Sequence, residues 1–404
     1  MKLGKSSPNY NSFNFNNIPT SSIPFQFSMK NLFFWLCFFS LSAQAQNSKT
    51  LLFVGTYSDS KPDKGIFIYQ FDTLTGDLQF LSNGESITNP SFIAVSPNGK
   101  WLYACTETKA ASMGNVSAFE IDSSAGKITF LNKQSSAGAN PVFVNVSKDG
   151  RYVLNGNYSD ASVSIYKIRN NGGLDSLSQC FRFNGKSISK RQEKAHIHSC
   201  YFSPDEAYVY LPDLGADSIR AFRFQPDSVH VLENAPERSV ACEPGSGPRH
   251  MAFHPNGAFA YCVEELSGNV SVYMLNQGFL SRIQLIFAYS KKQEEYNSAD
   301  IHISPDGLFL YASNRFDQEN TIAIFAIDPS TGLLELKGHQ STLGDHPRNF
   351  TLDKSGRFLL VANQLSNAVV VFKRDEKTGM LSPTGKEISV PRPSCLVLRE
   401  YQLP

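Results

Sequence analysis

Ser96-Pro97-Asn98-Gly99 separates two short apolar runs, Phe92-Ile93-Ala94-Val95 before it and Trp101-Leu102-Tyr103-Ala104 after it. Proline fixes φ, asparagine hydrogen-bonds to its own backbone, and glycine supplies the positive φ that a tight turn needs. Five variants of this phrase follow along the chain: Ser147-Lys148-Asp149-Gly150, Ser203-Pro204-Asp205-Glu206, His254-Pro255-Asn256-Gly257, Ser304-Pro305-Asp306-Gly307 and Asp353-Lys354-Ser355-Gly356. Strand-like runs flank each copy, so the sequence predicts a β-hairpin six times.

The spacing of the copies identifies the architecture. They begin at residues 96, 147, 203, 254, 304 and 353, so successive copies are 51, 56, 51, 50 and 49 residues apart. A period near fifty residues with several strands in each unit is typical of a β-propeller, in which each unit forms one blade. The repeat region sustains no helical periodicity. We therefore predict an all-β propeller.

The two ends of the repeat region predict a seventh blade. Leu51-Leu52-Phe53-Val54-Gly55-Thr56 indicates a strand without a preceding partner, and Pro393-Ser394-Cys395-Leu396-Val397-Leu398 mirrors the strand that begins at Pro90. Pairing of the two segments would close the ring and cover the exposed sheet edges. Residues 47–404, divided among seven blades, give about 51 residues each, which matches the observed period.

The first 46 residues have a different character. Met29-Lys30 precedes an apolar run over residues 32–39, and Ala43-Gln44-Ala45 follows it, which is the pattern of a secretory signal peptide. We expect residues 1–46 to be an upstream extension plus signal peptide, with Met29 as the true start, and residues 47–404 to be a single propeller domain. The apolar run is short for a bilayer span, although an N-terminal membrane anchor remains the alternative. The mature protein is expected to be periplasmic or extracellular.

The composition is that of an ordinary globular protein, with 41% hydrophobic residues, 18% charged residues and a net charge of +1. It provides no basic field for nucleic acid. A closed propeller needs no partner to cover its edges, so we expect a monomer without stable membrane insertion. Six cysteines remain after Cys37 of the apolar run, and they form no CxxC pair, so buried thiols are favoured over disulfides.

Polar residues gather at two positions of the repeat. Five residues before each turn phrase the chain carries Ser91, Val142, His198, Arg249, Ala299 and Arg348, and eleven residues after its first residue it carries Glu107, Tyr158, Leu214, Glu265, Arg315 and Gln364. Both positions lie at the end of the hairpin opposite the turn, so their side chains should converge at one mouth of the central channel. The alternative is a set of ion pairs that line a wet, inert channel. His196-Ile197-His198 has no carboxylate or cysteine partner nearby, so we predict no metal site.

Several separated motifs carry a resemblance to a known family. They are Lys194-Ala195-His196-Ile197-His198-Ser199, Pro212-Asp213-Leu214-Gly215, Gly247-Pro248-Arg249-His250, Glu264-Glu265-Leu266-Ser267, Ser313-Asn314-Arg315 and His346-Pro347-Arg348-Asn349. In this order the chain resembles the seven-bladed lactonase family, which contains propeller-type 6-phosphogluconolactonases and is similar to the fungal carboxy-cis,cis-muconate cyclase. The resemblance implies catalytic roles for His198, Arg249, Glu265 and Arg315. The neighbouring polar residues are expected to bind substrate: His196, His250, Asp300, Arg348 and Asn349.

Such a set of residues could open a lactone without metal or cofactor. Fixed guanidinium groups, here Arg249 and Arg315, would stabilise the oxyanion that forms when water attacks the carbonyl. His198, which can titrate near neutrality, would serve as the base, and Glu265 would either orient this histidine or take the proton itself. The sequence therefore predicts a 6-phosphogluconolactonase-like hydrolase with a small lactone as substrate. Two alternatives stay open: a muconate-type lactonising enzyme, and a binding propeller without turnover.

Overall fold

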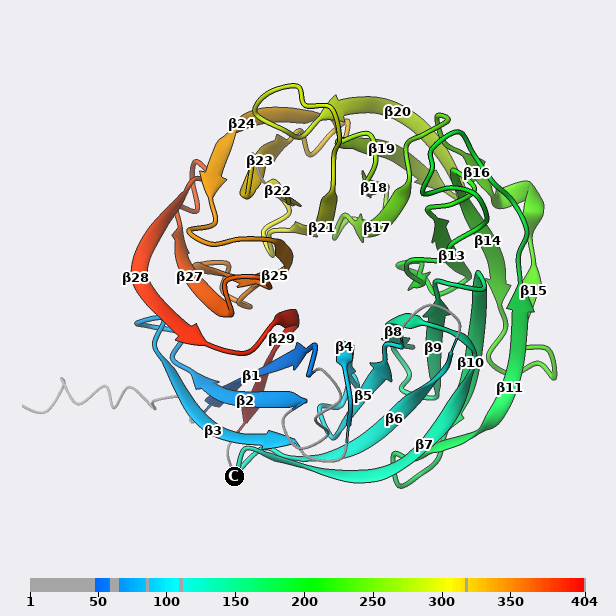
Figure 1. The fold of residues 1–404 in the computed structure, drawn as a ribbon, viewed down its shortest axis with the longest axis horizontal. Helices are drawn as coiled ribbons and strands as arrows, with labels where there is room; N and C mark the ends of the chain where they lie inside the picture. Colours follow the sequence, from blue (N-terminus) through cyan, green and yellow to red (C-terminus); the bar gives the residue numbers. More distant parts are fainter. Residues whose placement is uncertain (1–47, 59–64, 85–86, 109–111, 317–318, 403–404) are drawn as a thin grey trace, which may run out of the picture. The chain divides into compact units, whose positions relative to one another are not determined.

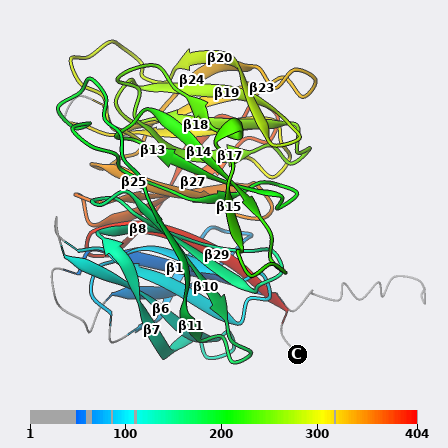
Figure 2. The same cartoon turned by 90° about the vertical axis from the view of Figure 1, so that its right-hand side faces the viewer.

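The computed structural model describes residues 48–58, 65–84, 87–108, 112–316 and 319–402. Within these ranges, seven antiparallel sheets form a ring, and each sheet is one blade (Figure 1). The strand that leads into each turn phrase is innermost, and the fourth strand lies at the rim. The predicted all-β, seven-bladed propeller is confirmed. Seen from the side, the strands run between the two faces of the ring (Figure 2).

Within each blade, the strands follow one another from the innermost to the outermost. Blade 1 contains β29 (Pro393–Gln402), β1 (Ser48–Thr56), β2 (Ile66–Phe71) and β3 (Leu78–Gly84). Blade 2 contains β4 (Pro90–Val95), β5 (Trp101–Thr106), β6 (Met113–Asp122) and β7 (Lys127–Ala139). Blade 3 contains β8 (Pro141–Val146), β9 (Tyr152–Asn157), β10 (Ser162–Ile168) and β11 (Leu174–Arg182). Blade 4 contains β12 (Tyr201–Phe202), β13 (Tyr208–Asp213), β14 (Ser218–Phe224) and β15 (Leu232–Asn234), with a short 3₁₀ helix η1 (Pro236–Arg238) before β16 (Val240–Ala241), which pairs with β14.

The remaining three blades have the regular four strands. Blade 5 contains β17 (Pro248–Phe253), β18 (Phe259–Glu264), β19 (Asn269–Asn276) and β20 (Phe279–Phe287). Blade 6 contains β21 (Ser298–Ile303), β22 (Phe309–Asn314), β23 (Thr321–Ile327) and β24 (Leu334–Ser341). Blade 7 contains β25 (Pro347–Leu352), β26 (Phe358–Asn363), β27 (Ala368–Arg374) and β28 (Leu381–Ser389).

The turn phrases join the first two strands of their blades, as predicted. In the first copy, the Ser96 hydroxyl accepts a hydrogen bond from the Trp101 amide at 3.0 Å, and the Ser96 carbonyl accepts one from the Gly99 amide at 2.8 Å. Gly99 has φ +72°, and Glu206, which replaces glycine in the third copy, takes the same left-handed region at φ +54°. The hairpin therefore forms in blade 4 even though the sequence lacks the preferred residue.

The core lies between neighbouring blades. Every residue of the second strand is buried in blades 3, 5, 6 and 7, because each of these strands is covered on both faces. Between blades 1 and 2, for example, Leu51, Phe53 and Ile68 pack against Ile93 and Leu102. Since each apolar layer belongs to two blades, stability depends on a complete ring.

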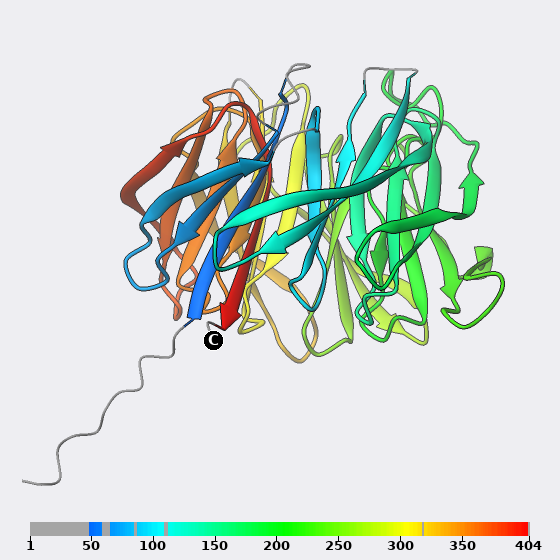
Figure 3. The ribbon, with the colours of Figure 1, turned by 90° about the horizontal axis from the view of Figure 1, so that it is seen from below.

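The ring closes through both terminal strands. The β1 and β29 strands are antiparallel, with Leu52 opposite Leu398 and Val54 opposite Leu396. Figure 3 shows the blue first strand beside the red last one. The predicted composite blade is therefore confirmed.

The predicted extension and signal peptide, residues 1–46, lie outside the described residues. Within the described part of the chain, no helix has the length and apolar character that a bilayer crossing requires.

Candidate active site

A β-bulge near the start of the innermost strand directs the side chains at the first polar position. In blade 5, Pro248 lies opposite Glu264, but His250 lies opposite Val263, so Arg249 is the extra residue. In blade 7, Pro347 lies opposite Asn363 and Asn349 opposite Ala362, so Arg348 is the extra residue. A bulge bends the strand locally and re-aims the side chain. The bulge therefore sets the direction in which both arginine side chains point.

The second polar position follows directly after the second strand of each blade. Glu265 comes after β18 and Arg315 after β22, while Glu107 and Tyr158 occupy the same place in blades 2 and 3. The Glu265 amide donates a 2.8 Å hydrogen bond to the carbonyl of Gly247, just before β17. This bond fixes Glu265 beside the bulge of its own blade.

These two positions meet around a polar cavity of about 310 Å³ at one mouth of the channel. Residues from five blades and from the segment before β12 line it: Glu107, Asn140, Val142, Tyr158, Arg191, His198, Glu265, Asn297, Arg315, His346 and Arg348. The expected convergence of side chains from separate blades is therefore present. Four predicted residues belong to the lining: His198, Glu265, Arg315 and Arg348.

Glu265 is the centre of charge in this cavity. Its Oε2 lies 2.7 Å from Nε of Arg249 and 3.4 Å from a terminal nitrogen of Arg315, and its Oε1 lies 2.6 Å from a terminal nitrogen of Arg191. Burial by itself would raise the pKa of Glu265, but the three guanidinium groups outweigh it and lower the pKa to about 2. The carboxylate is therefore ionised and a poor proton acceptor at neutral pH.

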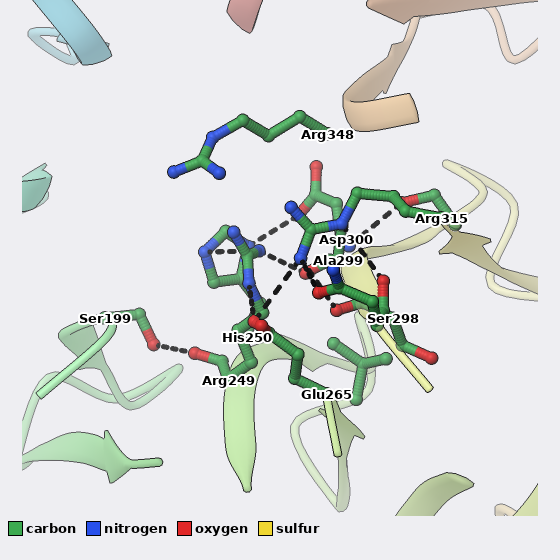
Figure 4. Close-up of polar contacts among 12 residues, drawn as sticks. Ser199, Arg249, His250, Glu265, Ser298, Ala299, Asp300, Arg315 and Arg348 are labelled. Carbon is green, nitrogen blue, oxygen red and sulfur yellow. Dashed lines mark hydrogen bonds and ion pairs between the residues drawn. The ribbon is translucent and has the colours of Figure 1, made fainter. Parts of the chain in front are cut away.

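The two buried arginines are held by further partners. The Arg315 guanidinium donates to the Asn297 carbonyl at 3.0 Å and to the Asn297 side-chain oxygen at 2.6 Å. Arg249 donates to the carbonyl of Ala299. Arg249 is only 1% exposed and is not a lining residue, so it contributes its charge from behind Glu265 (Figure 4).

His198 lies in the cavity wall as a neutral side chain. Burial, together with the positive charges of Arg249 and Arg348, lowers the pKa of His198 well below its usual value of 6.5. Its backbone amide donates to the Pro212 carbonyl at 3.0 Å, which fixes the main chain. Nδ1 of His198 is buried and has no hydrogen-bond partner among the described residues. The His198 imidazole therefore has unused hydrogen-bonding capacity in the cavity wall.

Arg348 differs from the other arginines because its guanidinium makes no hydrogen bond within the described part of the chain. Its nearest carboxylate oxygen, Oε2 of Glu107, is 3.8 Å away, and the same oxygen already accepts a 2.6 Å hydrogen bond from Tyr57. Figure 4 draws no polar contact between Arg348 and its neighbours. A guanidinium has five donors, so Arg348 retains capacity for an anion.

The other predicted residues lie near the cavity but not in its lining. The His196 ring stacks on Tyr158, with centroids 4.2 Å apart, and its Nδ1 lies 2.9 Å from the Tyr158 carbonyl. His250, Asp300 and Asn349 form a buried cluster beneath Arg249, in which Asp300 contacts both of the others. The predicted site residues thus fall into two groups: those that line the cavity, and those that lie behind the lining and contact it.

Sequence reasoning missed four lining residues: Asn140, Arg191, Asn297 and His346. Arg191 lies in the segment between β11 and β12, where the repeat is longest, at 56 residues between turn phrases instead of about fifty. That excess length is the feature of the sequence that could have pointed to Arg191, because an insertion at the mouth of a channel can cover a site. The other three precede innermost strands by one residue, a position outside the two polar registers.

The described residues contain no group of three or more His, Cys, Asp and Glu side chains arranged to hold a metal ion. The cavity residues combine a neutral histidine with fixed positive charges around a volume of about 310 Å³.

Comparisons of the sequence and of the structure with known proteins all find propeller lactonases or proteins named as lactonases. The family model described as "Lactonase, 7-bladed beta-propeller" matches residues 51–398. A Formosa agariphila protein named 6-phosphogluconolactonase is 45% identical over 351 residues, covering 87% of this chain and 99% of that protein. A solved structure from Bacteroides fragilis has a TM-score of 0.83 at 35% identity, covering 88% of this chain and 99% of its own. The periplasmic gluconolactonase of Pseudomonas aeruginosa has a TM-score of 0.81 at 33% identity, covering 88% and 100%.

Proposed function

The chain belongs to the seven-bladed β-propeller lactonase family, and we propose that it is a hydrolase that opens a sugar lactone with water in the cavity at the channel mouth. The observation that carries this proposal is the grouping of three arginines around one ionised carboxylate. Next to them lies a neutral histidine, one ring nitrogen of which has no hydrogen-bond partner within the described residues. The relative named 6-phosphogluconolactonase supports the same reaction.

In the proposed reaction, the oxygen of a water molecule attacks the lactone carbonyl while His198 accepts the proton from that water. Arg315, in the cavity wall, stabilises the resulting oxyanion, with the charge of Arg249 behind it. The ring C–O bond then breaks, and the leaving alkoxide takes the proton back from His198 to give the hydroxy acid. Glu265 acts by holding the three arginines in place, because its lowered pKa disfavours proton transfer to it.

The charges in the cavity favour an anionic lactone. In the lining, Arg191, Arg315 and Arg348 outnumber the carboxylates of Glu107 and Glu265, and Arg249 adds a further positive charge from outside the lining. Arg348 has no hydrogen bond within the described residues. A phosphate on the sugar would bind Arg348 through charge-assisted hydrogen bonds. Binding of this anion would also reduce the positive field on His198, so its pKa would rise toward the working pH.

We further propose that the enzyme is exported and acts as a monomer. The pattern over residues 29–45 supports export, and the Pseudomonas aeruginosa relative is described as periplasmic. Amino-terminal sequencing of the protein purified from its native host would test the processing. A new terminus near residue 47 is expected, whereas a chain that retains residues 29–46 would contradict export by a cleaved signal.

Hydrolysis by the purified protein tests the reaction. Acid release from glucono-δ-lactone and from its 6-phosphate is followed with a metal chelator present, against the spontaneous rate and against Arg315→Ala. Removing a stabilising donor from an oxyanion site costs about 10²–10³ in kcat, so the variant should approach background. Rates at background for the unaltered protein would favour a lactonising enzyme with another substrate or a binding propeller.

The proposed anion site at Arg348 has its own test. Arg348→Ala should raise KM for the phosphorylated lactone by about 10-fold, because a hydrogen-bonded charge pair contributes about 1.5–3 kcal/mol. KM for the uncharged lactone should change little, which provides an internal control in the same variant. Equal changes in KM for both substrates would contradict the assignment.

A further inference from the structure

His250 is placed in an aromatic floor beneath the cavity. Its ring centroid lies 5.9 Å from that of Phe92, 5.4 Å from that of Phe143 and 6.5 Å from that of Tyr201, all in edge-to-face contacts. The His198 ring lies above it at 5.3 Å. Burial, followed by the charge of Arg249, lowers the pKa of His250 to about 4. The imidazole is therefore neutral at pH 7 and carries one ring proton.

The position of that proton follows from the two neighbours of the ring. Nδ1 lies 2.8 Å from Oδ1 of Asp300, and Nε2 lies 3.2 Å from a terminal nitrogen of Arg249 (Figure 4). A carboxylate can only accept a hydrogen bond and a guanidinium can only donate one. Nδ1 must therefore carry the proton, and the lone pair on Nε2 accepts from Arg249.

The carboxylate of Asp300 is itself fixed by several donors. Its Oδ2 accepts hydrogen bonds from Nε2 of His302 at 2.9 Å, from the Asn349 side chain at 2.5 Å and from the Phe350 amide at 3.3 Å. The Asn349 oxygen in turn accepts from the Leu396 amide at 2.7 Å. The cluster thus joins the innermost strands of blades 5, 6 and 7 to the closing strand β29.

We propose that Asp300 and His250 are positioning residues, which select one tautomer of His250 and thereby fix the guanidinium of Arg249 against Glu265. The kinetic consequence of this arrangement rests on the proposed lactone hydrolysis, whereas the tautomer itself does not. Within the described residues, the Arg249 guanidinium makes its only side-chain hydrogen bond to His250, a second hydrogen bond to the Ala299 carbonyl, and an ion pair with Glu265. Its orientation is therefore set jointly by the histidine, the carbonyl and the carboxylate.

The substitution Asp300→Asn tests this assignment. Three donors face Oδ2 and one faces Oδ1, so the asparagine amide nitrogen should occupy the Oδ1 position, where it meets His250. Nδ1 would then have to accept, Nε2 would carry the proton, and Arg249 would face a donor. Because misplacement of a catalytic group by about 1 Å can cost 10²-fold, kcat should fall about 10- to 100-fold with a folded protein.

Asp227→Asn is the matched control. Asp227 has an 85% exposed side chain, lies outside the cluster and does not line the cavity. This variant should keep kcat within about 2-fold, whereas a purely structural role of the cluster would make Asp300→Asn lose stability and activity together. A second series compares His250→Gln, which retains an acceptor for Arg249, with His250→Leu, which does not; Gln should retain more activity.

A spectroscopic measurement tests the tautomer of His250 independently of the proposed lactone hydrolysis. Long-range ¹H–¹⁵N correlation spectra of the full protein at pH 7 should show the Nδ1–H tautomer of His250, and Asp300→Asn should show the Nε2–H tautomer. This result is expected whether or not the protein hydrolyses lactones. An Nε2–H tautomer in the unaltered protein, or an unchanged tautomer and unchanged kcat in Asp300→Asn, would overturn the proposal.

Discussion

Glu265 shows how one residue can govern the charge of the whole cavity. Three arginines would repel one another if they were placed in the same small volume without it, and two of them are buried. The carboxylate makes this arrangement stable and keeps the guanidinium groups in one orientation. Its effect should therefore appear in stability as well as in activity.

The stability effect has a defined dependence on pH. The folded-state pKa of Glu265 is about 2, below the ordinary value of 4.5, so its ionised form stabilises the fold above pH 4.5 and loses this contribution as the pH falls toward 2. Glu265→Gln should therefore lower the free energy of unfolding by about 3 kcal/mol at pH 7. The difference from the unaltered protein should shrink between about pH 4.5 and pH 2.

Chemical denaturation at pH 7, 5 and 3 measures this difference. The exposed Glu295 offers a control, because Glu295→Gln removes a carboxylate without removing an arginine partner. A stability difference for Glu265→Gln that stays constant down to pH 3 would show that the carboxylate is not the source of the effect.

His198 is the residue that should set the pH dependence of activity. Its pKa is lowered well below 6.5 by burial and by the neighbouring arginines, so the neutral form required of a base is present at every pH above that value. We expect kcat/KM, corrected for spontaneous hydrolysis, to be level between about pH 6.5 and 8 and to fall only in more acidic solution.

Removal of the imidazole should lower kcat while the fold is retained. Loss of a general base costs about 10²–10⁴-fold, so His198→Gln should fall in that range, and the exposed His230 provides a matched His230→Gln control with unchanged kinetics. A His198→Gln variant with an unaltered rate would exclude His198 as the base.

At the scale of elements, the segment between β11 and β12 distinguishes this site from a plain propeller channel. Gln192 anchors it, donating to the Leu214 carbonyl at 2.8 Å and to Asp217 at 2.7 Å. The neighbouring Arg191 extends over the cavity with a 46% exposed side chain and reaches Glu265. It is the most accessible of the three arginines that bind this carboxylate.

This position predicts a role in substrate capture. Arg191→Gln should raise KM for an anionic lactone by about 10-fold, because a charge-assisted hydrogen bond contributes about 1.5–3 kcal/mol, while kcat changes less. Steady-state kinetics of Arg191→Gln and of the exposed neighbour variant Lys190→Gln would measure the difference. Equal KM values for the two variants would contradict a specific contact.

At the scale of the whole molecule, the cavity exists only when the ring is closed. Its lining comes from blades 2, 3, 5, 6 and 7 and from the segment that leads into blade 4. Blade 1 contributes no lining residue among those described, yet its β29 strand connects to the Asp300 cluster through Asn349. Closure and site geometry are therefore coupled.

Weakening the closing strand should destabilise the complete domain. Leu396 in β29 is 4% exposed and packs with Leu52 and Val54, so Leu396→Ala should cost about 2–4 kcal/mol of unfolding free energy. Leu365→Ala, at a position that is 53% exposed, should stay within about 0.5 kcal/mol. Thermal unfolding of both variants checks this, and equal melting temperatures would argue against closure as a source of stability.

The register of the turn phrases predicted which residues meet at the channel mouth. It did not predict which of them line the cavity and which are enclosed behind the lining. Counting from each turn placed Arg249 and Arg348 at equivalent positions, and both are bulged residues at the cavity end of their strands. The count could not show that Arg249 is enclosed behind Glu265 while Arg348 stays in the wall. That difference arises from contacts between blades, which have no signature within one repeat.

By itself, the sequence determined the seven blades, the hairpin turns and the composite closing blade, because proline, asparagine, glycine and alternating apolar runs act over a few residues and recur at a fixed period. Only the tertiary structure decided the partners of Glu265, the approach of Arg191 and the proton position on His250. These depend on side chains from separate blades, most of them far apart in the chain, and on burial, which shifts pKa values only once the ring has closed around them.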